Sequence, residues 1–64
     1  MEKKRFLSVR ELAEYLGIKR HTIYSWVSMR RIPYVKMGGR VKFDLRDIEK
    51  WIQERKVEIH EIWI

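Results

Sequence analysis

The chain has 64 residues, with 15 lysine or arginine and nine aspartate or glutamate residues, which gives a net charge of +6. There is no cysteine, and the two histidines, His21 and His60, lie far apart, so we expect no disulfide framework, no metal site and no cofactor. No apolar run approaches the roughly 20 residues of a membrane span, and the apolar run after the basic start is too short for a signal peptide, so we expect a cytoplasmic protein without a membrane partner.

The basic residues are concentrated in the first two thirds of the chain. Residues 1–43 carry a net charge of +8, whereas residues 44–64 carry a net charge of −2. A basic body with a mildly acidic tail favours the binding of a polyanion by one face of the protein. Small proteins are often basic for solubility alone, so the charge needs support from the arrangement of the elements.

Residues 1–5 are charged and predict a flexible basic N-terminus, either a solvated tail or an arm on phosphate. The first predicted helix follows, and the sequence carries a helix-end signal at each of its ends. Ser8-Val9-Arg10-Glu11 has the pattern of a capping box, which predicts a helix from Val9 to Leu16. Gly17 is typical of the residue that closes a helix in the left-handed conformation.

A second helix is predicted from Lys19 to Arg31. Its inner side carries apolar residues at helical spacing, namely Ile23, Trp26 and Val27. Its outer side carries hydrogen-bonding groups and one phenol ring, namely His21, Tyr24, Ser25 and Ser28. A solvated surface helix would normally mix glutamate with its basic residues, and this one has none, so the helix is suited to a nucleic-acid groove. Two helices joined by a tight turn with glycine form a helix-turn-helix.

A β-hairpin, which we call the wing, is predicted after the second helix. Ile32-Pro33 ends that helix, because proline disfavours helical geometry in the preceding residue. Two alternating runs, 34–37 and 40–43, flank Gly38-Gly39, a pair that supplies the positive φ angles of a hairpin turn. We expect three apolar residues to face the core, namely Val35, Val41 and Phe43. We expect three basic residues to point outward, namely Lys36, Arg40 and Lys42.

Asp44 is placed to cap a third helix, whose inner residues Leu45, Ile48, Trp51 and Ile52 recur at helical spacing.

The tail, residues 56–64, is strongly apolar at its end and has no turn signal before it. It could extend this helix, or it could alternate as a strand does. An apolar patch of this kind has to pack on something. The two alternatives are the chain's own domain and self-association through Ile59, Ile62, Trp63 and Ile64.

The order of these elements resembles the excisionase-family DNA-binding domain, which belongs with the MerR-like winged helix-turn-helix proteins. The matching stretches are LSVRELAEYLGIKRHTIYSWV (7–27) and RIPYVKMGGRVKFDLRDIEKWI (31–52). The resemblance covers about residues 6–55. It implies a mostly α fold with one small hairpin, in the order α-α-β-β-α, between a flexible N-terminus (1–5) and an apolar tail (56–64).

Members of that family bind double-stranded DNA, either as small transcription regulators or as excisionases that bend DNA for a recombinase. The resemblance implies a second helix in the major groove and a wing on the minor groove or its phosphates. The expected base contacts are Arg20, His21, Thr22, Tyr24 and Ser25. The expected phosphate and wing contacts are Lys19, Arg30, Arg31, Lys36, Gly39, Arg40 and Lys42. The chain departs from the family at Lys19, where a serine cap is frequent, and at the wing turn, where many members carry consecutive basic residues.

Two alternatives to DNA binding remain open at this stage. One is an RNA-binding winged helix. The other is a protein-interaction adaptor whose active surface is the apolar tail. The partners expected beside double-stranded DNA are a recombinase or the transcription machinery. We do not expect an enzyme, because no nucleophile–base pair, paired carboxylates or phosphate-cradling loop can be assembled and Ser8, Asp44 and Asp47 are already used at helix N-termini.

Overall fold

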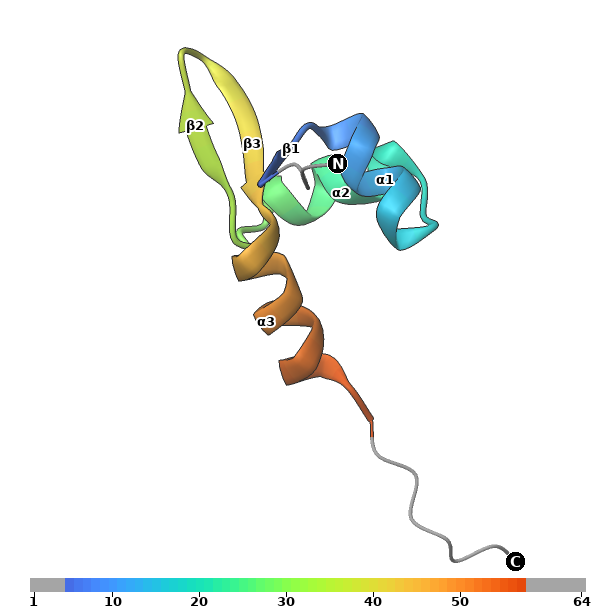
Figure 1. Cartoon of the computed structure of the whole chain (residues 1–64). Coiled ribbons are helices and arrows are strands. Elements are labelled where there is room, and N and C mark those ends of the chain that lie inside the picture. The colour runs from blue at the N-terminus through green and yellow to red at the C-terminus, as the bar shows by residue number, and fades with distance from the viewer. Residues whose placement is uncertain (1–4, 58–64) are drawn as a thin grey trace, which may run out of the picture.

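The computed structural model describes residues 5–57, and the elements within that range are three helices and three short strands (Figure 1). In chain order they are β1 (Phe6–Leu7), α1 (Val9–Leu16), α2 (Arg20–Ser28), β2 (Val35–Met37), β3 (Arg40–Asp44) and α3 (Leu45–Arg55). The predicted winged helix-turn-helix layout is confirmed. In Figure 1 the β2–β3 hairpin and α3 extend in opposite directions from the pair formed by α1 and α2.

The ends of α1 are formed by local hydrogen bonds, as the sequence predicts. The Ser8 hydroxyl accepts from the Glu11 N–H at 3.1 Å, and the Ser8 N–H donates to Glu11 Oε1 at 2.9 Å. Gly17 has a φ of 71° and donates its N–H to the Ala13 carbonyl at 2.8 Å. The Ile18 N–H donates to the same carbonyl at 3.1 Å, so the chain turns sharply into α2.

The second helix is shorter than predicted at both ends. Lys19 is its N-cap and provides no side-chain cap, and the helix ends at Ser28. The Arg30 N–H donates to the Val27 carbonyl at 3.0 Å, and the Arg31 N–H donates to the Trp26 carbonyl at 2.8 Å. This is a Schellman closure with Arg30 in the left-handed position, at a φ of 56°. The prediction of a helix up to Arg31 was therefore wrong, because an arginine occupies the position where glycine is the usual signal.

The strands form an antiparallel sheet in the order β1-β3-β2. The predicted hairpin is confirmed, and Gly38 and Gly39 have positive φ angles of 56° and 83° in its turn. Strand β1 was not predicted. It pairs Phe6 with Asp44 and Leu7 with Phe43, so Leu7 is a sheet and core residue.

The register of the hairpin corrects the predicted faces of the wing. A two-residue turn pairs even-numbered with odd-numbered positions, so Lys36 lies opposite Val41 and Val35 lies opposite Lys42. Directly opposed residues share a face of the sheet. Lys36 and Arg40 are both exposed, as expected, but they lie on opposite faces. Val35 shares the face of Arg40 and Lys42, and it does not join Val41 against the core.

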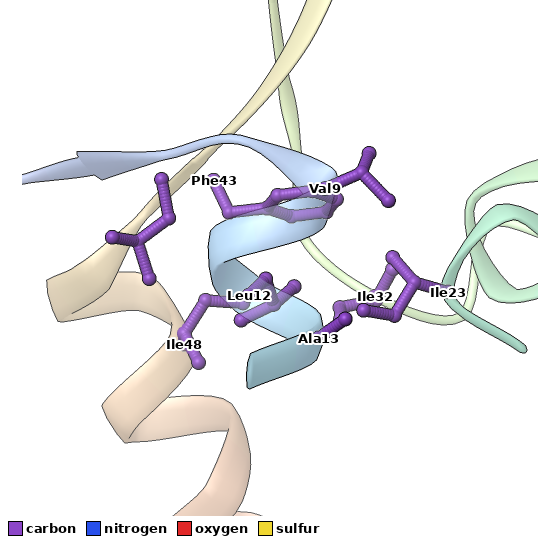
Figure 2. Close-up of a cluster of buried hydrophobic side chains, with 8 residues drawn as sticks. Val9, Leu12, Ala13, Ile23, Ile32, Phe43 and Ile48 are labelled. Atoms are coloured by element: carbon purple, nitrogen blue, oxygen red, sulfur yellow. The ribbon is translucent and has the colours of Figure 1, made fainter. Parts of the chain in front are cut away.

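The core is small and draws on β1, the three helices, β3 and the segment after α2, but not on β2. Its buried residues are Leu7, Val9, Leu12, Ala13, Ile23, Ile32, Phe43 and Ile48. Four of them are fully buried, one each from α1, α2, β3 and α3, namely Leu12, Ile23, Phe43 and Ile48. Figure 2 shows these side chains gathered beside α1, with Ile48 of α3 pointing toward Leu12. Because α2 and β3 each contribute a fully buried side chain to the same cluster, the core fixes α2 relative to the wing.

The start of α3 is held by Asp44, as predicted, and also by Arg5. One oxygen of Asp44 accepts from the Arg46 N–H at 3.0 Å, and the other accepts from the Arg5 guanidinium at 3.1 and 3.3 Å. These hydrogen bonds with Arg5 are the main cause of a pKa of Asp44 below its ordinary value of 3.8. The Leu45 N–H donates to the Arg5 carbonyl at 2.7 Å, so Arg5 is a structural residue and not part of a free arm.

Helix α3 ends at Arg55, and the next residue is extended. Lys56 has φ and ψ angles of −70° and 127°, so the helix does not continue into the tail at that residue. The predicted self-association residues lie outside the described part of the chain, and so do residues 1–4. Within residues 5–57 no helix is long and apolar enough to span a membrane.

Candidate nucleic-acid interface

A groove of about 450 Å³ opens between α1, the first half of α2 and the wing. Its lining residues are Ser8, Val9, Arg10, Arg20, Tyr24, Gly39, Arg40, Val41 and Lys42. Three segments that are distant in the sequence thus surround one space with three arginines and a lysine. Five residues predicted to contact DNA are brought together here, namely Arg20, Tyr24, Gly39, Arg40 and Lys42.

The exposed side of α2 carries two adjacent rows of predicted contacts. Arg20 and Tyr24 are four residues apart, so they lie on one row, and both line the groove. His21 and Ser25 form the next row and are exposed. Tyr24 leaves 58% of its surface exposed, although it is a large aromatic residue. Thr22 is half-buried, and its N–H donates to the Lys19 carbonyl at 3.1 Å, so it belongs more to the start of the helix than to its open face.

Several predicted contacts are exposed but do not line the groove. Lys19 lies at the N-cap of α2, and Arg30 and Arg31 lie beyond its C-terminal end. Lys36 lies on strand β2, away from the groove lining. All four are exposed positive charges, and Arg31 lines a separate hollow with Trp26, Trp51 and Arg55.

The cations of α2 and the wing have no carboxylate beside them. Residues 15–43 contain no aspartate or glutamate. The ion pairs within the described range lie elsewhere, at Arg5–Asp44 (3.1 Å), Arg10–Glu14 (3.8 Å) and Arg55–Glu54 (3.9 Å). Among the described residues Arg20, Arg40 and Lys42 therefore have no ion-pair partner. A bound polyanion would supply the partners that the protein does not.

Arg10 is the residue that the sequence reasoning missed. It sits in the first turn of α1, and it was interpreted only as an inner residue of the capping box. The packing of Val9 in the same cluster as Phe43 brings this turn beside the wing, and Arg10 then lines the groove. Its ion pair with Glu14 is weak, since both side chains are 70% exposed. The only available signal was its position two residues after the cap.

The side of α2 away from the groove is fixed to α3. The rings of Trp26 and Trp51 are 5.5 Å apart and tilted by 54°. The indole N–H of Trp51 donates to the Arg31 carbonyl at 2.9 Å, and the Arg55 guanidinium lies 4.4 Å from the centre of the Trp51 ring. Trp26 is therefore occupied in packing, as its position on the inner side of the helix predicts.

No group of histidine, aspartate and glutamate side chains within residues 5–57 is arranged to hold a metal ion. Asp44, whose pKa is lowered, lies outside the groove. The groove therefore offers fixed positive charge, hydrogen-bond donors and one aromatic ring. These are the groups with which proteins contact phosphates and base edges.

Comparison with known proteins supports this interpretation of the groove. A family model described as a helix-turn-helix domain matches residues 6–56, which is most of the chain. No curated protein and no solved structure matched. The matched range contains every element of the fold and every residue of the groove. The chain therefore belongs to the excisionase-like helix-turn-helix family of DNA-binding domains.

Proposed function

We propose that this protein binds specific sites on double-stranded DNA with α2 in the major groove and the wing on the adjacent minor groove and its phosphates. In this role it acts as a small transcription regulator or as an excisionase-like factor that sets the direction of recombination. The observation that carries the proposal is the groove between α1, α2 and the wing, in which Arg20, Arg40 and Lys42 have no carboxylate partner within the described range. A duplex is the polyanion whose grooves fit a helix and a hairpin side by side.

The open side of α2 reads the bases. The major groove is about 12 Å wide and admits an α-helix, and each base pair presents a distinct pattern of donors and acceptors there. The proposed base contacts are Arg20, His21, Thr22, Tyr24 and Ser25. Arg20 is suited to O6 and N7 of guanine, because a guanidinium donates two parallel hydrogen bonds. The first half of the helix supplies these contacts, as in other helix-turn-helix proteins.

The surrounding cations position the duplex. The proposed phosphate and wing contacts are Lys19, Arg30, Arg31, Lys36, Gly39, Arg40 and Lys42, and the groove adds Arg10 to them. Each contact releases condensed counterions and contributes affinity without sequence information. The exposure of these side chains, and the absence of acidic residues from 15 to 43, support this division of roles.

An RNA duplex is a poorer fit to the same surface. The major groove of A-form RNA is deep and narrow, so the side chains of a helix do not reach its bases. The described sheet also lacks the exposed aromatic pair on which single-stranded bases stack. Partners beyond DNA, such as a recombinase, the transcription machinery or a second copy held by Ile59, Ile62, Trp63 and Ile64, involve the tail and are tested separately by deleting residues 57–64.

Selection of bound sequences from a random pool of DNA duplexes tests the proposal directly. We expect one enriched motif, and an enriched palindrome or repeat would reveal binding by more than one copy. With about five phosphate contacts, the affinity for that motif falls with salt at a log–log slope of roughly −4 to −5. Duplex RNA and single-stranded DNA of the same sequence serve as competitors. A flat salt dependence, or equal competition by RNA, would refute the proposal.

A further inference from the structure

The tip of the wing pairs an exposed methionine with an arginine. Met37 and Arg40 flank the Gly38-Gly39 turn and lie directly opposite each other in the hairpin register. Directly opposed residues share a face, so the two side chains project from the same face of the wing. Met37 leaves 42% of its surface exposed. Arg40 is exposed and has no ion-pair partner within the described range.

Met37 has no structural task in the described domain. It is absent from the core and from the partly buried residues packed against the core. Figure 1 shows the turn of the hairpin at the end farthest from α1 and α2. A polar residue would keep such a tip in water at no cost in packing. An exposed apolar side chain at this tip is therefore available to contact a partner.

The end of the wing is small enough to approach a minor groove closely. Its two turn residues are glycines without side chains, so Met37 and Arg40 carry the first side chains behind the turn. The minor groove of B-form DNA is about 6 Å wide and 7.5 Å deep. Grooves alternate along a duplex, so a hairpin beside a helix in the major groove meets the flanking minor groove. This step rests on the function proposed above for α2.

We propose that Met37 is a wedge that enters a base-pair step from the minor groove, while Arg40 binds beside it in the same groove. Minor-groove proteins insert apolar side chains, methionine included, to unstack one step and kink the duplex by 20–90°. Methionine is unbranched and flexible, which suits a narrow gap between bases. The neighbouring arginine gains from the negative potential of a narrow, A·T-rich minor groove.

This assignment makes a prediction about the DNA site itself. Pyrimidine–purine steps such as TA and CA/TG unstack easily, so one of them is expected beside the bases read by α2. The wedge makes no base-specific hydrogen bond, and its preference comes from the cost of deforming the step. Replacing Met37 by alanine should therefore relax the preference at that one step and leave the motif read by α2 unchanged.

The test measures DNA bending with the full chain on a duplex that carries the selected motif and fluorescent labels at both ends. We expect the wild type to bend the duplex by tens of degrees. With Met37→Ala we expect most of the bend to be lost and the affinity to fall by about tenfold at most. The slope of the salt dependence should not change, because no phosphate contact is removed. Met37→Phe, which keeps an apolar wedge, should retain the bend.

Met29→Ala is the matched control. Met29 is a methionine of similar exposure, 49%, at the C-cap of α2 and outside the wing. It should leave the bend and the step preference as they are in the wild type. An unchanged bend in Met37→Ala, or an unbent duplex with the wild type, overturns the wedge while DNA binding stands. Absence of any enriched motif overturns the proposed function instead.

Discussion

Helices α2 and α3 are both amphipathic and each carries one tryptophan, but their outer sides differ in charge. Helix α3 mixes three acidic with three basic residues along its length, which is the pattern of a solvated surface. Helix α2 carries no acidic residue, and neither does the wing up to Phe43. The same local rules form both helices, so the charge of the outer side, and not the helical pattern, separates a binding helix from a supporting one.

Removing cations from the groove should have the largest effect. We expect Arg20→Gln combined with Arg40→Gln to weaken binding of the selected duplex by about 100-fold or more, since each lost arginine contact costs about 1–3 kcal/mol. Both side chains are exposed and unpaired within the described chain, so the free energy of unfolding should change by less than about 0.5 kcal/mol. Fluorescence anisotropy and urea denaturation measure the two quantities.

The matched control removes the same charge from α3. Arg46 and Lys50 are exposed on that helix, and replacing both with glutamine lowers the net charge by the same amount. A change of less than about threefold in affinity is expected, because exposed charges far from the duplex are screened within about 10 Å at 0.1 M salt. Equal losses of affinity in the two double variants would show that the total charge of the protein, and not the groove, determines the affinity for the duplex.

Arg30 offers a smaller effect in which stability and binding move in opposite directions. Its left-handed backbone at a φ of 56° is unfavourable for a residue with a Cβ atom. Arg30→Gly should raise the free energy of unfolding by about 0.5–1 kcal/mol. It should also weaken DNA binding a few-fold and reduce the salt slope by about 1, because one phosphate contact is lost.

Arg30→Lys keeps the charge and the strained backbone, so it should resemble the wild type in both measurements. Urea denaturation and binding over a salt series provide the readouts. A glycine variant that is less stable than the wild type would contradict the strain argument. A glycine variant with unchanged salt slope would remove Arg30 from the phosphate contacts.

The smallest predicted effect concerns pH and lies on the α3 side. The pKa of Asp44 is below 3.8 in the folded protein, chiefly because Arg5 donates hydrogen bonds to it. At pH values near and below 3.8 the unfolded chain therefore binds more protons than the folded protein. The stability that the Arg5–Asp44 pair contributes is present above pH 3.8, and it is lost as pH falls through the pKa of Asp44 in the folded protein. Arg5→Gln should raise the pKa of Asp44, as measured by NMR titration of its carboxyl group.

The same variant should be less stable than the wild type at pH 6, and the difference should narrow as pH falls below 3.8. DNA binding at pH 7 should not change, since Arg5 lies outside the groove lining. A pKa of Asp44 that stays low without Arg5 would assign the shift to the Arg46 N–H, which also donates to this carboxylate.

Features that depend on a few neighbouring residues could be predicted from the sequence. The capping box at Ser8 and Glu11, the left-handed Gly17 and the glycine turn of the wing all follow from local chemistry. The end of α2 could not be predicted, because Arg30 takes a conformation for which its side chain gives no signal. Strand β1 has two residues, which is too short for an alternating pattern.

The candidate site was predictable as a set of residues but not as a surface. Residues of α2 and the wing were identified by their charge and spacing, and the groove unites five of them. Arg10 joins them only because the core folds the first turn of α1 against β3, a contact between distant parts of the chain. The length of the turn sets which residues of β2 and β3 are paired. A two-residue turn therefore already implies that Lys36 and Arg40 lie on opposite faces of the sheet.

Strand β1 also bears on how the domain assembles. The α1–α2 pair and the hairpin form between residues that are near in sequence, whereas the Arg5–Asp44 pair spans 39 positions and encloses almost the whole domain. Loop-closure entropy makes such long-range contacts the slow ones in folding. The order of events expected from this topology is early formation of the binding elements and late docking of β1. Truncating the chain before Leu7 should therefore accelerate unfolding more than it slows folding.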